Sequence, residues 1–175
     1  MRATERQEYI LKKLQSSSAP ISATSLAKEL QVSRQVIVGD VALLRAKDHD
    51  IIATHRGYIL SNHIVETTPQ YRAKIVCKHS VHEVQRELEI VVENGGKLLD
   101  VQVEHPIYGT LSAPLNISTF EDILYFMEKL SHYQESLLSS LTDGIHIHTI
   151  SCDSRASFEQ IKQRLAEESL LFTEN

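Results

Sequence analysis

The sequence predicts an α+β protein of two domains, and three patterns support that prediction. Residues 4–60 carry the apolar spacing of three short helices followed by a strand, a loop and a second strand, which is typical of a winged helix-turn-helix. Residues 73–175 follow the order strand, helix, strand, strand, helix, strand and final helix, which is typical of a ferredoxin-like α/β sandwich. A polar stretch broken by Pro69 separates the two patterns. We therefore expect a winged helix-turn-helix at 1–62, a linker at 63–72 and the sandwich at 73–175.

The helices of the first domain each carry one apolar stripe, at the i, i+3, i+4 spacing of a helix with one buried face. The stripes are formed by Ile10, Leu11 and Leu14, by Leu26, Ala27 and Leu30, and by Ile37, Val41 and Leu44. Ser33 precedes the third helix and is a suitable N-cap, since its hydroxyl accepts a backbone N–H. The runs 51–54 and 58–60 flank His55, Arg56 and Gly57, which predicts a hairpin with a basic residue at its tip.

The outward face of the third helix predicts contact with DNA. Arg34 and Gln35 lie on its first turn, where a recognition helix meets the base edges of the major groove, and both side chain types bond bases bidentately. Arg45, farther along, is better placed for phosphates, and Arg56 at the hairpin tip for the sugar-phosphate backbone. The predicted DNA-binding residues are Ser33, Arg34, Gln35, Val38, Arg45 and Arg56.

The composition indicates a globular protein, with 175 residues of which 42% are hydrophobic and 23% charged. Residues 1–66 hold nine Lys and Arg against seven Asp and Glu, so the whole-chain net charge of -5 arises in the second half. Such a modest excess predicts salt-sensitive DNA binding that needs two copies of the winged helix-turn-helix.

No apolar run reaches the ~20 residues of a membrane helix and no signal peptide is visible, so we expect a cytoplasmic protein without a membrane partner. Cys77 and Cys152 are expected to be reduced, small hydrophobic residues.

The elements of the second domain have local signals. Capping boxes of Ser80 with Glu83 and of Ser118 with Glu121 predict the starts of two helices, and Asn94-Gly95-Gly96 predicts the end of the first. The expected strands are 73–77, 98–104, 110–117 and 145–152, with a bend at 105–109 between the second and third.

Three histidines and one glutamate fall on inward-facing positions of this domain. His146 and His148 lie two residues apart on one strand, so both imidazoles leave the same face of the sheet. His79 continues the inward phase of strand 73–77, and Glu87 lies on the buried stripe of the following helix. A buried carboxylate is costly unless it is paired or bound to a cation. We therefore predict a metal site of His79, Glu87, His146 and His148, suited to one zinc, nickel, copper or iron ion rather than magnesium or calcium.

Together these residues resemble the niacin-responsive repressors of NAD biosynthesis, the NiaR family. In the first domain the resemblance is carried by residues 32–38, Asp40, residues 43–45 and the hairpin 51–58. In the second domain, it is carried by the features of the family's three-histidine (3H) domain, which are His79, Glu87, Asn94-Gly95-Gly96, residues 105–109 and residues 144–149. Gly39 departs from the family pattern, which has a larger polar residue inside the recognition helix.

The resemblance implies a dimeric, non-enzymatic repressor of genes for NAD biosynthesis or niacin uptake, with nicotinic acid as corepressor. It also implies one divalent transition metal per subunit, nickel or zinc and possibly iron, held by the four residues above. We expect a vacant coordination position, with a hydrogen-bonding group beside it, to hold nicotinate. The predicted effector-binding residues are His82, His105 and Tyr108. The corepressor then favours the dimer whose recognition helices lie about 34 Å apart, one turn of DNA.

Three other functions remain open at this level. In the first, the chain is a metal-sensing repressor whose effector is the ion itself. In the second, it is a metal-dependent hydrolase that activates water; this ranks lower because Glu87 is already used as a ligand and no second carboxylate shares its face. In the third, the metal is purely structural in an interaction module.

Overall fold

The computed structural model describes residues 1–63, 70–133 and 136–173. The chain divides into two compact units, Met1–Thr67 and Thr68–Asn175, each with its own hydrophobic core. Within the described residues, no helix is both long and apolar enough to span a bilayer.

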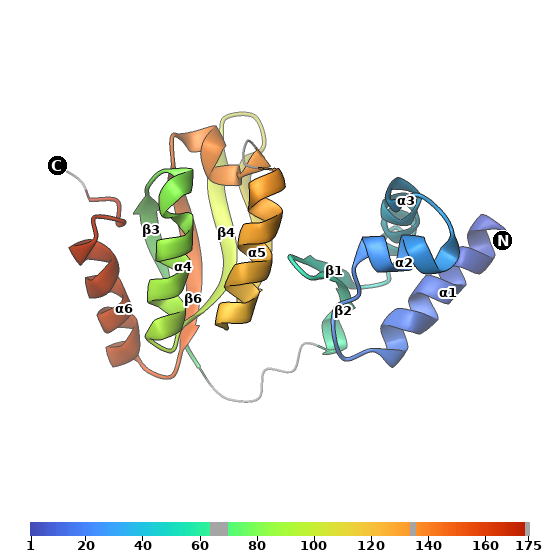
Figure 1. Ribbon diagram of the computed structural model, residues 1–175, viewed down its shortest axis with the longest axis horizontal. Helices are drawn as coiled ribbons and strands as arrows, with labels where there is room; N and C mark the ends of the chain where they lie inside the picture. Colours follow the sequence, from blue (N-terminus) through green and yellow to red (C-terminus); the bar gives the residue numbers. More distant parts are fainter. Residues whose placement is uncertain (64–69, 134–135, 174–175) are drawn as a thin grey trace. The chain divides into compact units, whose positions relative to one another are not determined.

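The first unit has the predicted order of three helices and a hairpin (Figure 1). Its elements are α1 (Ala3–Ser16), α2 (Ala23–Leu30), α3 (Arg34–Arg45), β1 (Ile51–Thr54) and β2 (Gly57–Leu60). The three helices and β1 bury the predicted apolar stripes in one cluster, which includes Ile10, Leu26 and Ile37. The strands β1 and β2 pair antiparallel, and Ile21 adds a bridge to Tyr58 that ties the hairpin to the segment before α2.

Local sequence sets the helix ends in this unit. The Ser33 hydroxyl accepts the backbone N–H of Val36 at the start of α3, as predicted. Gln31 adopts a left-handed conformation with φ 54°, which produces the tight turn between α2 and α3. The end of α2 and the start of α3 are therefore both capped at the turn between them.

The second unit is a two-layer sandwich. Its elements are β3 (Tyr71–Lys78), η2 (Val81–Glu83), α4 (Val84–Glu93), β4 (Lys97–His105), β5 (Gly109–Ile117), α5 (Phe120–His132), η4 (Leu138–Thr142), β6 (Ile145–Cys152) and α6 (Arg155–Glu167). The strands form one antiparallel sheet in the order β3-β6-β4-β5, and α4, α5 and α6 lie against one face of it (Figure 1). The predicted α+β class and the predicted order of elements are confirmed.

Two details differ from the expectation. A ferredoxin-like sheet keeps its first strand in the interior, whereas here β3 lies at the edge and the last strand, β6, is interior. The strand β3 begins at Tyr71, two residues before the expected start of the second domain. At the other end of the expected linker, His63 bonds through Nδ1 to the Ser17 carbonyl within the first unit, and residues 64–69 lie outside the described residues.

The position of β6 places its histidines in the centre of the molecule's second core. In the register of β3 with β6, Cys77 is opposite His146 and Ile75 is opposite His148. Both imidazoles leave the face covered by α4, because they share the phase of the buried residues Ile150 and Cys152. The site described below is therefore enclosed between the sheet and a helix.

Candidate metal centre

The structure brings together the four residues that the sequence assigns to a metal site. The Glu87 carboxylate is at the centre, with Oε2 2.9 Å from His79 Nε2 and Oε1 3.1 Å from His146 Nε2. His148 Nε2 lies 3.3 Å from the same Oε1. Each of these side chains is at most 4% exposed. One carboxylate from α4 thus meets three imidazoles from the end of β3 and from β6.

The other nitrogen of each imidazole bonds to a backbone carbonyl. His79 Nδ1 lies 3.0 Å from Ser80 O, His146 Nδ1 lies 2.8 Å from Gly144 O, and His148 Nδ1 lies 2.6 Å from Asp100 O. A carbonyl only accepts hydrogen bonds, so each Nδ1 must carry the proton. In the neutral form of all three rings, the unprotonated Nε2 therefore points at Glu87.

The electrostatics of this cluster favour a positive charge beside Glu87. Burial opposes ionisation of Glu87, yet the charge on His148 and the hydrogen bonds that His146 and His148 donate when their Nε2 is protonated outweigh burial and lower the pKa of Glu87 well below its usual range. Burial likewise opposes the charged form of His79 and His148, but Glu87 raises the pKa of both. A cation bound between the imidazole nitrogens and the carboxylate would balance the negative charge of Glu87 without protonation of the buried imidazoles.

The donor set fits a divalent transition metal. His79 Nε2 is buried and, within the described part of the chain, makes no hydrogen bond of acceptable geometry despite its closeness to Glu87. Three imidazole nitrogens and one carboxylate oxygen suit zinc, nickel or iron. The Nδ1 bonds to carbonyls are the kind of support that holds metal-binding imidazoles in orientation.

Cys77 belongs to the same cluster, which sequence reasoning missed by assigning it only to the core. Its Sγ, a carboxylate oxygen of Glu87 and a ring nitrogen of His146 all lie within 4.8 Å of one another. The side chain is fully buried, and burial together with Glu87 raises the pKa of the thiol. One signal was present in the sequence, since Cys77 shares the inward phase of His79 two residues later.

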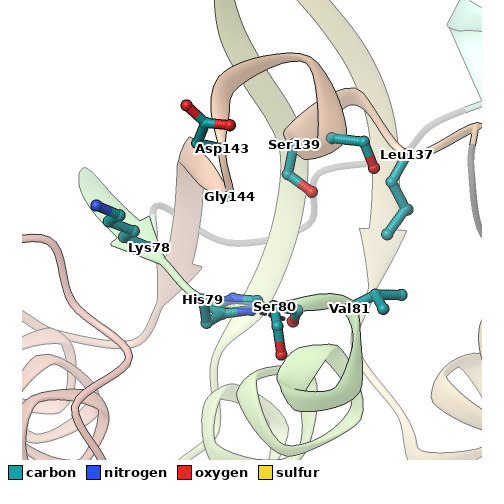
Figure 2. Close-up of a pocket in the computed structure, with 9 residues that line it drawn as sticks. Lys78, His79, Ser80, Val81, Leu137, Ser139, Asp143 and Gly144 are labelled. Carbon is teal, nitrogen blue, oxygen red and sulfur yellow. Dashed lines mark hydrogen bonds between the residues drawn. The ribbon is translucent and has the colours of Figure 1, made fainter.

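Two cavities adjoin the cluster. The larger has a volume of about 790 Å³; His79, Ser80 and Val81 lie on one side of it and Leu137, Ser139, Asp143 and Gly144 on the other (Figure 2). The smaller reaches all four cluster residues, and its remaining walls are mainly apolar, formed by Val84, Leu88, Val101, Leu115, Phe126, Leu137, Leu138 and Ser139. The two cavities share His79, Leu137 and Ser139 as lining residues.

The predicted effector-binding residues are not among those that line the two cavities. His105 and Tyr108 stack with ring centroids 4.9 Å apart at the turn between β4 and β5, where Tyr108 is 72% exposed. His105 Nδ1 accepts the backbone N–H groups of Ile107 and Tyr108, so the ring shapes the turn. His82 is exposed in η2. Residues 137–139, from the segment before β6, are among those that line the cavities.

The predicted DNA-binding residues are distributed over α3 and the hairpin. Arg34 and Gln35 are exposed on the first turn of α3, after the cap at Ser33, and Val38 is half-buried one turn later. Arg45 Nε donates to the Ile51 carbonyl at 2.8 Å, and its guanidinium lies over the Tyr58 ring. Arg45 therefore also fixes β1 and β2 against the end of α3. Arg56 lies in the turn between β1 and β2.

Comparisons with known proteins agree with this architecture. A helix-turn-helix (HTH) domain family matches residues 6–59, and the 3H domain family matches residues 72–174. The chain is 36% identical over 166 residues to Transcription repressor NadR of Bacillus subtilis, covering 95% of this chain and 92% of that protein. It is 37% identical over 170 residues to Probable transcription repressor NiaR of Thermotoga maritima, covering 97% of this chain and 95% of that protein.

Proposed function

The chain belongs to the family of helix-turn-helix transcription repressors that carry a 3H domain, and on that premise we propose that it represses genes of NAD biosynthesis or niacin uptake in the cytoplasm. Nicotinic acid is the proposed corepressor, and the second unit is its receptor. The observation that carries this proposal is the buried Glu87 carboxylate facing three Nδ1-protonated imidazoles beside a cavity.

His79, Glu87, His146 and His148 are the residues that would hold a divalent transition metal. When bound, the ion supplies a Lewis acid that attracts a carboxylate or a pyridine nitrogen. The chain's own residues supply the rest of the receptor: Leu115 and Phe126 offer apolar walls for a flat ring. The larger cavity adds the Ser139 hydroxyl, which is suited to an anionic group.

The first unit reads the operator through α3. We propose that Arg34 and Gln35 contact base edges and that Arg56 contacts the backbone from the hairpin. A homodimer presents two such helices to half-sites about 34 Å apart. Nicotinate shifts the population toward that dimer only by binding it more tightly, and a coupling of about 1 to 3 kcal/mol is typical.

Calorimetric titration of nicotinate tests the receptor. We expect binding to protein loaded with zinc or nickel and loss of binding after chelation. Nicotinamide lacks the carboxylate and benzoate lacks the ring nitrogen, so comparing the two with nicotinate identifies the group that the site recognises. Equal binding of nicotinate to loaded and chelated protein would refute the metal-dependent receptor.

Substitution of one ligand tests the coupling to DNA. His146→Ala should lower metal content and nicotinate-dependent operator affinity together, because His146 is a buried neighbour of Glu87. His132→Ala is the matched control, since His132 is exposed at the end of α5. If His146→Ala kept full corepression without metal, the centre would play no part in the effector response. If metal alone strengthened operator binding without nicotinate, the ion would be the effector.

A further inference from the structure

We infer that Cys77 is a thiolate ligand of the same centre, so that the donor set contains sulfur as well as imidazole and carboxylate. The inference rests on the proposed metal centre and extends it to a residue outside the four-residue set. Cys77 reaches the cluster from β3, next to the strand that carries His146 and His148.

The distances match what a shared ion requires. Zn–S bonds are about 2.3 Å long and Zn–N bonds about 2.0 to 2.1 Å, so two ligand atoms of one ion lie at most about 4.4 Å apart. Cys77 Sγ, the Glu87 carboxylate and the His146 ring nitrogen lie within 4.8 Å of one another before any ion draws them closer. The three atoms are therefore close enough for side-chain adjustment to bring them onto one ion.

A second observation points to a ligand at this place. His79 Nε2 is buried near the Glu87 carboxylate and has no hydrogen bond of acceptable geometry within the described residues. A buried nitrogen without a hydrogen-bond partner needs an explanation, and a cation shared with the neighbouring thiol and carboxylate would supply one. This observation concerns side-chain geometry alone and is independent of the cavities.

Cys77 occupies the closed side of the centre. It is fully buried and does not line either adjoining cavity, whereas His79 lines both. A thiolate on the closed side leaves the cavity side for a small molecule. On coordination the S–H bond breaks heterolytically, the sulfur electron pair forms the bond to the ion and the proton passes to the buffer; no electrons are transferred.

The chemical consequence is selectivity. A thiolate favours zinc, cobalt and other softer ions over magnesium, calcium or manganese. The other cysteine, Cys152, offers an internal comparison, because it lies on the same face of the adjacent strand β6 and is 1% exposed. Its Sγ donates to the Ser154 carbonyl at 3.3 Å rather than contacting the cluster.

Cobalt(II) spectroscopy of the full chain tests the inference. Visible d–d bands report that cobalt is bound, and a near-ultraviolet thiolate-to-cobalt charge-transfer band reports a Co–S bond. We expect both in the wild-type protein and in Cys152→Ser. In Cys77→Ser, we expect the charge-transfer band to disappear while the visible bands remain. Serine retains a hydroxyl donor toward Glu87, which makes it the mildest substitution.

The outcomes distinguish failure of the Cys77 inference from failure of the proposed metal centre. Visible bands without charge transfer in the wild-type protein would refute the role of Cys77 and leave the proposed centre intact. Failure of cobalt to bind at all would refute the centre and the inference together. Should Cys77→Ser not fold, the band in wild-type protein and in Cys152→Ser is enough, because the chain has 2 cysteines. Loss of the charge-transfer band in Cys152→Ser would assign the Co–S bond to Cys152 and refute the role of Cys77.

Discussion

At the scale of single residues, Gly144 fixes the backbone that positions ligands of the proposed metal centre. Its φ is +86°, a conformation that side chains disfavour, and a Cβ placed there would lie 2.4 Å from the His79 carbonyl oxygen. The Gly144 carbonyl is also the acceptor for His146 Nδ1. The glycine therefore positions two of the three imidazoles at once.

Gly144→Ala should lower metal affinity by about 10- to 100-fold, the typical effect of disturbing groups that orient the ligands. Competition with a chromogenic chelator measures this affinity. Gly109→Ala is the matched control, because Gly109 has a φ of +71° and open space around the position of a Cβ. Both variants carry backbone strain of about 1 to 2 kcal/mol, but the affinity should fall only in Gly144→Ala. An equal loss in the two variants would show that strain, rather than the approach to His79, is responsible.

Residue periodicity predicts which side chains share a face, and here it brings His79, Glu87, His146 and His148 to one place. It does not predict what surrounds them. The stacked pair His105 and Tyr108 lies at a turn whose direction no local pattern specifies. Cys77 has the pattern of a core residue, and only the pairing of β3 with β6 places it beside His146.

At the scale of elements, the two capping boxes of the second unit show how closely local sequence marks the start of a helical segment. Ser80 and Glu83 form the predicted capping box, with the Ser80 N–H donating to Glu83 Oε2 at 2.9 Å. At α5 the predicted pair Ser118 and Glu121 is wrong by one position, because the cap is Thr119 with Asp122. Two adjacent hydroxyl residues followed by two adjacent acids offer the same signal in both registers. The strand order depends instead on contacts between distant segments, and local patterns do not determine it.

Gly39 weakens the recognition helix. It lies exposed within α3, and a Cβ added there would meet nothing within 4 Å. Gly39→Ala should therefore raise the free energy of unfolding of the first unit by about 0.8 to 1 kcal/mol, the cost of glycine inside a helix. Urea denaturation followed by circular dichroism measures the change. Exposed Ala42→Gly in the same helix is the reverse control, with an expected loss of similar size. A destabilised Gly39→Ala would mean that α3 requires glycine for its backbone conformation.

At the scale of the whole molecule, separate cores predict that metal stabilises one unit and not the other. All the proposed ligands belong to the second unit, and a ligand at 100 times its Kd adds about 2.7 kcal/mol to the unit that binds it. Differential scanning calorimetry with zinc and then with EDTA should shift one transition and leave the other at its temperature. In His146→Ala the shift should vanish. Movement of both transitions by the same amount would show that the units unfold as one cooperative body.

The distribution of charge predicts how the whole molecule meets DNA. The chain has 18 Lys and Arg against 23 Asp and Glu, so attraction to phosphates must come from a few residues of the first unit rather than from net charge. Arg56→Ala should weaken binding to all sequences alike and reduce the slope of log affinity against log salt by about 1, because one phosphate contact is lost.

Arg34→Ala should instead reduce discrimination between operator and unrelated DNA by about 1 to 3 kcal/mol, with little change in the salt slope, because a base contact carries sequence information and a phosphate contact does not. Gel-shift titrations at several salt concentrations, with saturating nicotinate and metal, separate the two effects. Lys12→Ala is the control for loss of a positive charge, since Lys12 is exposed on α1 rather than on the recognition helix or the hairpin. If Arg34→Ala and Arg56→Ala changed specificity and salt slope in the same proportion, α3 would not be the element that reads the bases.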